Sequence, residues 1–162
     1  MIKNTIKYLA VFVLLAWFSG CTGIYENGKE LAEDAKARVP EISVDDLKAG
    51  IDSGAAFTII DVRQLAEYNS GNIPGSVCIP RGLLEFKIGN STFWEEQYMY
   101  PPEKGDEIII YCKSGARGTL AAESLIQIGY TNVKNLTGGF VAFDPAAASG
   151  EVKHEESGGC GG

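Results

Sequence analysis

Short apolar runs alternate with stretches of helical periodicity through the middle of the chain. Runs this short that are rich in Ile and Val are typical of buried strands. We predict strands over residues 57–62, 76–79, 107–111 and 133–136. Between the last two runs, apolar residues recur at helical spacing from Leu120 to Ile128, and Gly129 follows as a helix stop. This alternation predicts an α/β fold with a central, mostly parallel sheet and helices on both faces.

Capping and turn residues define three shorter helices. Ser43 with Asp46 three positions later forms a capping-box pattern, and the turn at residues 53–54 closes the helix that it begins. Residues 64–68 suit a second short helix, and residues 138–140 open the last one. These helices stand next to predicted strands in the sequence, as connections in a parallel sheet require.

The first twenty residues carry a different pattern. Lys3 and Lys7 precede an apolar run over residues 8–18, and no acidic residue interrupts it. A run of this length is too short to cross about 30 Å of hydrocarbon as a helix, but it matches the core of a secretory signal peptide. We therefore predict that residues 1–20 are a signal peptide that is absent from the mature protein.

The apolar run is followed by Ser19, Gly20 and Cys21. This order resembles the cleavage box of bacterial lipoproteins, which implies that Cys21 becomes the lipidated first residue and anchors the protein to a membrane. The resemblance implies a lipoprotein of the bacterial cell envelope that faces the periplasm. Thr22 stands where an Asp would resemble an inner-membrane retention signal, so the outer membrane is favoured. The alternative is an ordinary secretory signal with an incidental Cys21.

The remaining segments flank one domain. Residues 21–40 are mostly polar, with a helical pattern that Pro40 ends, and we expect a lipid-anchored stalk there. Residues 41–145 hold all the predicted strands and form the domain. Residues 146–162 are small and polar, so a flexible, Gly-rich tail is expected.

Composition narrows the chemistry that this domain can perform. The 162 residues include 14 basic and 21 acidic side chains, so the net charge is −7. This acidic balance gives no support for binding a phosphate backbone, which excludes nucleic acid as a partner. The chain has one His, His154, and four Cys, too few for a multi-His metal site or a disulfide-rich scaffold. We expect neither a metal nor a cofactor, and chemistry that depends on Cys, Arg, Lys and carboxylates.

The segment with the clearest chemistry lies between the strand predicted over 107–111 and the helix after it. Its residues are Cys112, Lys113, Ser114, Gly115, Ala116, Arg117 and Gly118. The carboxyl end of a parallel strand meets the amino end of the next helix, whose unpaired N–H groups favour a thiolate over a thiol. Lys113 and Arg117 add positive charge, and the small residues let several amides turn toward one centre. The segment predicts a nucleophilic sulfur inside an anion pocket rather than a structural cysteine.

This segment resembles the active loop of the rhodanese homology family, which runs Cys, a variable residue, Ser-Gly, a variable residue and Arg. Three further motifs agree with that family in order and spacing. They are Asp61-Val62-Arg63 with Glu67-Tyr68, residues 71–76 with Ile79-Pro80, and residues 136–140. Two residues depart from the family, since Asn72 stands where His is usual and Gly118 where Ser is common. The resemblance covers residues 41–145 and implies the rhodanese-like fold.

The resemblance implies a sulfurtransferase of the thiosulfate sulfurtransferase type. Cys112 would attack the outer sulfur of a small anionic donor such as thiosulfate, hold it as a persulfide, and pass it to a thiol or another thiophilic acceptor. Lys113 and Arg117 would hold the anionic donor, and no His is needed because the thiolate is already formed. Asp61 and Arg63 are supporting residues at the end of another strand. We expect Asp61 to accept loop N–H bonds and Arg63 to pair with Glu67.

Other functions remain open at this point. Cysteine-dependent phosphatases share this kind of fold but place the Arg one position further from the Cys, so the shorter loop here favours sulfur over phosphate. A thiol redox or sulfur-carrier module could use Cys112 with Cys160 as a resolving thiol, and a tethered binding protein could retain the loop without its chemistry. Cys78 is predicted to pack in the core.

Overall fold

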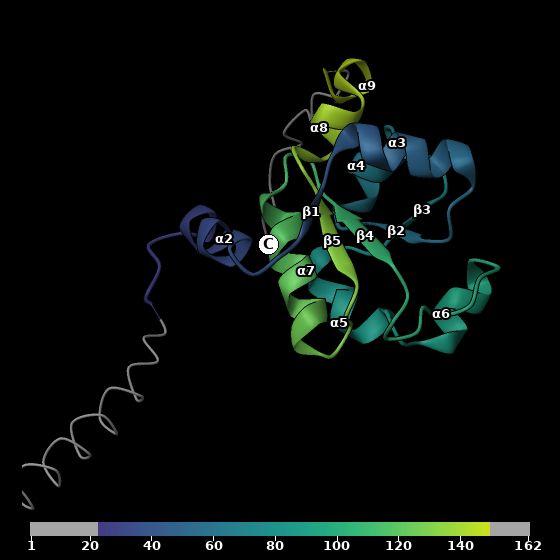
Figure 1. The fold of residues 1–162 in the computed structure, drawn as a ribbon, viewed down its shortest axis with the longest axis horizontal. Coiled ribbons are helices and arrows are strands. Elements are labelled where there is room, and N and C mark those ends of the chain that lie inside the picture. Colours follow the sequence, from purple (N-terminus) through teal and green to yellow (C-terminus); the bar gives the residue numbers. More distant parts are fainter. Residues whose placement is uncertain (1–22, 150–162) are drawn as a thin grey trace, which may run out of the picture.

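The computed structural model describes residues 23–149 (Figure 1). Within this part of the chain, five strands form one sheet in the order β1-β5-β4-β2-β3. The strands are β1 (Glu41–Ile42), β2 (Thr58–Asp61), β3 (Ser76–Cys78), β4 (Ile108–Tyr111) and β5 (Val133–Leu136). All four pairings between neighbours are parallel. The α/β fold with a parallel sheet is confirmed, and the four strands predicted from the sequence are all present.

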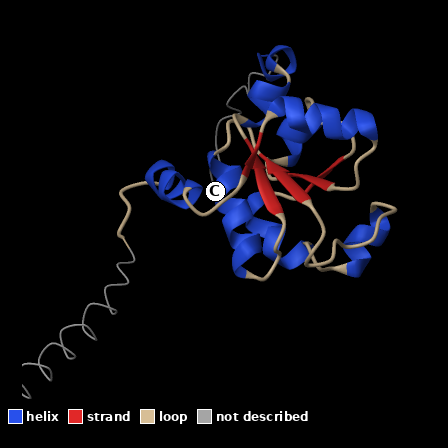
Figure 2. Ribbon diagram, viewed as in Figure 1, coloured by secondary structure: helices blue, strands red, loops and turns tan. Residues whose placement is uncertain are grey.

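Helices cover both faces of the sheet (Figure 2). They are α2 (Gly28–Lys36), α3 (Val44–Ser53), α4 (Leu65–Asn69), the 3-10 helix η1 (Arg81–Leu83), α5 (Leu84–Lys87), α6 (Ser91–Glu96), α7 (Ala116–Gln127), α8 (Gly139–Phe143) and α9 (Pro145–Ser149). The Ser43 hydroxyl accepts the Asp46 N–H at 3.1 Å and caps α3, and Gly54 ends α3 in the left-handed conformation at φ 68°. The predicted cap and stop of this helix are therefore confirmed.

The alternation of side chains along the strands divides the core into two clusters. In β4, Ile108 and Ile110 belong to the first cluster, whereas Ile109 and Tyr111 belong to the second, because successive strand side chains point to opposite faces. Buried residues of α5, α6 and α7 complete the first cluster. Residues of α3 and α8 complete the second. Both faces of β4 are buried, so the residue that follows it is fixed in position.

Helix α2 differs from the spacer that the sequence predicts. Its Ala32 and Ala35 are buried and it packs on α7, while Val39 joins the first core cluster. The Arg38 guanidinium pairs with Glu123 of α7 at 2.7 Å. The apolar contacts of this segment come mainly from two small Ala side chains, so hydrophobicity alone gave little indication of them. Residues 28–39 are therefore part of the folded body.

The C-terminal part of the described chain differs as well. Residues 145–149 form α9, where the sequence predicts a flexible tail from residue 146 onward. Cys21, His154 and Cys160 lie outside the described residues, as do the predicted signal peptide and most of the predicted tail. Among residues 23–149, none of the helices has both the length and the apolar character needed to cross a membrane.

Candidate active site

Cys112 lies directly after β4, in the middle of the carboxyl edge of the sheet. Because β4 pairs with β5 on one side and with β2 on the other, the ends of neighbouring strands flank the loop that follows it. Cys112 is 1% exposed, and the Gly115 N–H donates to its Sγ at 3.2 Å. Gly115 has φ 108°, a conformation that favours glycine. The conformation of the loop thus directs the Gly115 N–H toward Cys112 Sγ.

Helix α7 begins immediately after Gly115. Ala116, Arg117 and Gly118 are therefore its first turn, whereas the sequence placed them in a loop. The unpaired N–H groups of a first turn carry the positive end of the helix dipole. Their position next to Cys112 gives this acidic protein a local positive potential, which favours the binding of an anion.

The amino end of α8 holds the loop from the other side. The Phe140 N–H donates to the Cys112 carbonyl at 2.8 Å, and the Val141 N–H donates to the Lys113 carbonyl at 3.0 Å. A Cβ on Gly139 would overlap both carbonyl oxygens, so only glycine allows this approach. The sequence segment 136–140 therefore has a physical role, because it fixes the backbone of the loop that begins at Cys112.

Asn135 of β5 lies beneath the loop and was not predicted as a site residue. It is buried, and its Nδ2 donates to the Thr119 hydroxyl at 3.1 Å. Thr119 donates in turn to the Gly115 carbonyl, from its hydroxyl at 3.3 Å and from its N–H at 2.9 Å. A Cβ on Gly118 would overlap Asn135 Oδ1. The unusual Gly118 in the sequence was the one indication that another side chain fills this space.

Arg117 forms a two-bond pair with Glu67. Its Nη1 and Nη2 donate to the two carboxylate oxygens of Glu67, each at 2.9 Å. The Arg117 guanidinium, assisted by the Gln64 N–H, lowers the pKa of Glu67 to about 2, and Glu67 raises the pKa of Arg117. Arg117 remains 41% exposed at its side chain. The role of Arg117 in binding an anionic donor stays a prediction, because in the structure a carboxylate already occupies two of its N–H groups.

Asp61 and Arg63 form a buried pair behind the loop. The Arg63 N–H and side chain both donate to the Asp61 carboxylate, with Nη2 to Oδ2 at 2.7 Å. A further Nη2 bond of 2.6 Å reaches the Gly71 carbonyl, and the guanidinium lies 4.2 Å from the centre of the Phe140 ring. Asp61 accepts a loop N–H as predicted. The predicted pair between Arg63 and Glu67 is wrong, because Arg63 turns inward to Asp61 and leaves Glu67 to Arg117.

Tyr111 connects the residue 71–76 segment to β4. Its hydroxyl accepts the Ile73 N–H at 3.1 Å and bonds with the Ser76 hydroxyl at 3.0 Å, and burial raises the pKa of this phenol. Asn72, which stands in place of the usual His, is exposed and donates to the Tyr68 carbonyl at 3.2 Å. The departure at Asn72 is thus accommodated by a local bond and does not disturb the buried contacts of the segment.

The other loop residues and thiols differ in accessibility. Ser114 is exposed and Lys113 half-buried. Cys78 is half-buried at the end of β3 and belongs to neither core cluster, so its predicted packing in the core is wrong. Desolvation raises the pKa of its thiol to about 11, which favours the neutral form. Within residues 23–149, no three His, Cys, Asp or Glu side chains gather closely enough to hold a metal ion.

Comparison with known proteins matches this architecture to one family. The family model for the rhodanese-like domain matches residues 43–146. A sulfurtransferase of Allochromatium vinosum is 30% identical over 105 residues, covering 65% of this chain and 88% of the relative. The thiosulfate:glutathione sulfurtransferase of Homo sapiens is 31% identical over 110 residues, covering 64% of this chain and 92% of the relative.

Other relatives are longer than this chain. A Bacillus subtilis protein named as a sulfur carrier is 33% identical over 114 residues, which cover 70% of this chain but 55% of that protein. A mitochondrial thiosulfate sulfurtransferase relative from Schizosaccharomyces pombe is matched over 60% of its length. The chain therefore spans between a half and two thirds of these two proteins.

Solved structures agree with the fold. A human single-domain sulfurtransferase superposes with a TM-score of 0.60 at 29% identity, covering 65% of this chain and 95% of that one. A Rhodopseudomonas palustris protein of unknown function, described as a possible tyrosine phosphatase, gives a TM-score of 0.62 at 30% identity, covering 75% and 92%. The family match over residues 43–146 and the similarity to these sulfurtransferases agree with the position of Cys112 at the start of its loop. The chain belongs to the rhodanese-like domain family.

Proposed function

We propose that the protein is a sulfurtransferase that moves sulfane sulfur from an anionic donor such as thiosulfate to a thiophilic acceptor through a persulfide on Cys112. The observation that carries the proposal is the position of Cys112 Sγ, which accepts the Gly115 N–H at 3.2 Å beside the first turn of α7. The sulfurtransferases and sulfur carrier among the relatives support the general role. The donor and the persulfide are proposed for this chain.

The reaction divides into two thiol exchanges. In the first, the Cys112 thiolate attacks the outer sulfur of thiosulfate, the bond between the two donor sulfurs breaks, and sulfite leaves with the bonding electron pair. In the second, the sulfur of a thiolate acceptor attacks the outer sulfur of the persulfide, and the electron pair of the broken bond returns to Cys112 Sγ. No net oxidation or reduction of the protein occurs over the cycle.

The loop residues supply what these steps need. The Gly115 N–H and the amino end of α7 stabilise negative charge on sulfur before and after each attack. Lys113 and Arg117 attract an anionic donor. The α8 amides bond to the Cys112 and Lys113 carbonyls and keep the loop in one conformation. The N–H groups that stabilise the sulfur therefore need not reorganise during the reaction.

Phosphatase activity is the competing function, raised by the description of the Rhodopseudomonas palustris relative. The spacing of the loop favours sulfur transfer for this chain, because Arg117 comes five positions after Cys112, one fewer than in the cysteine-dependent phosphatases. We therefore expect no turnover of an aryl phosphate under conditions in which thiosulfate releases sulfite.

A single-turnover reaction with thiosulfate tests the proposed function. The wild type should release one sulfite per protein before any acceptor is added, and Cys112→Ser should release none. Cys78→Ser is the matched control, because Cys78 is the second free thiol in the described part of the chain, and it should behave as the wild type does. Sulfite release that survives in Cys112→Ser would contradict the proposal.

We also propose that lipid on Cys21 holds this domain at the cell envelope. The support is the sequence order of basic residues, apolar run and Ser19-Gly20-Cys21. Since α2 belongs to the folded body and begins at Gly28, the chain from Cys21 spans at most roughly 25 Å. The domain would then lie close to the membrane surface. Labelling with radioactive palmitate should mark the wild type and not Cys21→Ser, and equal labelling would contradict the anchor.

A further inference from the structure

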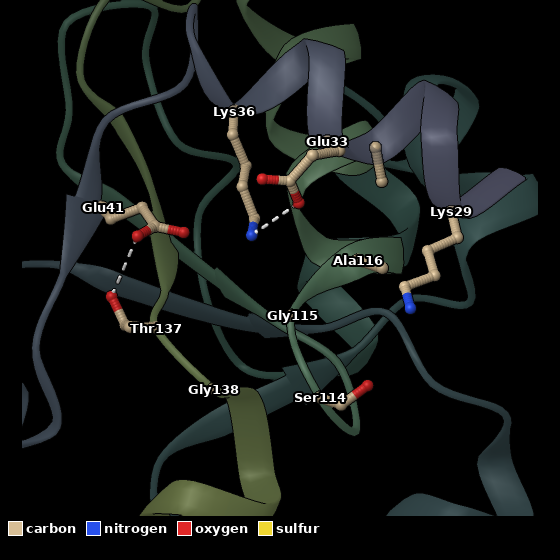
Figure 3. A pocket seen from close by; sticks show the side chains of 10 residues that line it. Lys29, Glu33, Lys36, Glu41, Ser114, Gly115, Ala116, Thr137 and Gly138 are labelled. Carbon is tan, nitrogen blue, oxygen red and sulfur yellow. Dashed lines mark hydrogen bonds and ion pairs between the residues drawn. The ribbon is translucent and has the colours of Figure 1, made fainter. Parts of the chain in front are cut away.

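A pocket of about 300 Å³ lies between helix α2 and the catalytic loop (Figure 3). One wall is formed by Lys29, Glu33 and Lys36 of α2, and the opposite wall by the backbone of residues 114–116. Glu41 and the residues after β5 close the remaining side. A volume of this size accommodates a small molecule such as an amino acid or a short peptide.

Every charged residue of the pocket comes from outside the segment shared with the family. Lys29, Glu33, Lys36 and Glu41 all precede residue 43, where the match to the rhodanese-like domain begins. The family segment contributes the catalytic loop and the turn at Thr137 and Gly138. The fold therefore combines a shared reaction centre with charged groups added by this chain, an arrangement suited to selecting a substrate.

The charges of the pocket are of both signs and are not all paired. Lys36 pairs with Glu33 at 2.9 Å, and Glu41 accepts the Thr137 hydroxyl at 3.3 Å. Within residues 23–149 the Lys29 ammonium has no ion-pair partner, and its side chain extends from α2 toward Ala116 (Figure 3). The pocket thus offers an available cation on one side and the Glu41 carboxylate on the other.

The pocket adjoins the reacting sulfur through one residue. Gly115 lines the pocket and also donates its N–H to Cys112 Sγ at 3.2 Å. The outer sulfur of a persulfide would extend about 2 Å from Sγ. Gly115 therefore separates the pocket from that sulfur, and a ligand in the pocket that takes up the sulfur must extend its reacting group past Gly115.

We propose, on the basis of the sulfurtransferase function above, that this pocket binds the sulfur acceptor and that the acceptor is a small zwitterionic thiol of the amino-acid type. Its carboxylate binds Lys29, and its ammonium group binds Glu41. The acceptor thiol loses its proton to solvent, and its sulfur attacks the outer sulfur of the Cys112 persulfide. The Cys112–sulfur bond breaks, its electron pair stays on Cys112 Sγ, and the acceptor leaves as a persulfide.

The test separates the two half-reactions of the full-length protein. Thiosulfate first loads the persulfide, and sulfite release measures this step. Decay of the persulfide is then followed against the concentration of four thiols. Cysteine carries a carboxylate and an ammonium group, 3-mercaptopropionate only the carboxylate, cysteamine only the ammonium group, and 2-mercaptoethanol neither. In the wild type, cysteine should show the lowest half-saturating concentration of the four.

Three variants identify the groups involved. Lys29→Ala should raise the half-saturating concentration for cysteine and 3-mercaptopropionate about tenfold, and Glu41→Gln should do the same for cysteine and cysteamine. Neither should change loading by thiosulfate or decay with 2-mercaptoethanol. Lys104→Ala is the matched control, because Lys104 precedes β4 at the amino edge of the sheet and donates to the Ile128 carbonyl.

The outcomes keep the two proposals apart. If thiosulfate loads no persulfide, the proposed function fails. If loading is normal but the four thiols saturate alike, or if Lys29→Ala and Lys104→Ala respond equally to cysteine, the acceptor pocket is overturned while the proposed function stands. Both Lys29 and Glu41 are exposed, so their substitution should leave folding intact, which a far-ultraviolet circular dichroism spectrum checks.

Discussion

Asn135 occupies the space beside Gly118, so that any Cβ at position 118 would overlap its Oδ1. The same amide donates to Thr119, which bonds to the carbonyl of Gly115. The chain of contacts therefore runs from β5 through the first turn of α7 to the residue whose N–H meets Cys112 Sγ. Asn135 is a positioning residue for the loop, although it does not touch the sulfur.

Gly118→Ser should consequently destabilise the protein and disturb the loop. Adding atoms to this packed position should lower the free energy of unfolding by about 1–3 kcal/mol and slow sulfite release. In Gly118→Ser/Asn135→Ala the overlap is removed, so the double variant should be more stable than the sum of the two single effects predicts. Denaturant unfolding of the wild type, the two single variants and the double variant measures the four free energies of unfolding. Strict additivity of the two single effects would show that positions 118 and 135 are independent.

The buried pair of Asp61 and Arg63 should be important for stability. Asp61→Asn leaves the Arg63 guanidinium buried without its counter-ion, which should cost about 3–5 kcal/mol of unfolding free energy. Arg38→Ala, which breaks more exposed ion pairs with Asp34 and Glu123, should cost clearly less than Asp61→Asn. Urea titrations at neutral pH compare the two. Equal losses would mean that burial does not determine the strength of the Asp61–Arg63 pair.

The pair of Glu67 and Arg117 should make stability depend on pH in the acid range. Because the folded-state pKa of Glu67 is about 2, below its ordinary value of 4.5, the pair contributes fully above about pH 4.5 and its contribution is lost as the pH falls toward 2. Both side chains are partly exposed, so the contribution should be at most about 1 kcal/mol.

Glu67→Gln tests this dependence. The stability difference between wild type and variant should be constant near neutral pH and should shrink as the pH falls below about 4.5. Glu96→Gln, at an exposed position on α6, is the matched control. A difference that grows on acidification would have the wrong sign for a carboxylate with a lowered pKa.

The sequence could predict the elements whose own residues determine them. Three consecutive Ile residues, Ile108 to Ile110, place apolar side chains on both faces of a strand, so β4 could be predicted from its own residues. Ser43 and Gly54 likewise marked the two ends of α3. The loop at Cys112 was recognisable because the strand, the small residues and the helix are contiguous. Each of these features depends on residues close together in the chain.

Features that depend on distant residues could not be predicted in this way. β1 has two residues and exists because it pairs with β5, and α2 is stabilised by packing on α7. The choice of Arg117 rather than Arg63 as the partner of Glu67 depends on which side chain can reach Asp61 in the core. The pocket beside Lys29 combines segments that are about eighty residues apart, and nothing in either segment alone indicates it.

Intact-mass spectrometry of the thiosulfate-treated protein tests the central claim most directly. A persulfide on Cys112 adds one sulfur atom, about 32 Da, and peptide mapping should place it on the peptide that contains Cys112. A reducing thiol should remove the added mass, and Cys112→Ser should never acquire it, whereas Cys78→Ser should acquire it as the wild type does. An unchanged mass in the wild type, or an added sulfur that persists in Cys112→Ser, would contradict sulfur transfer through Cys112.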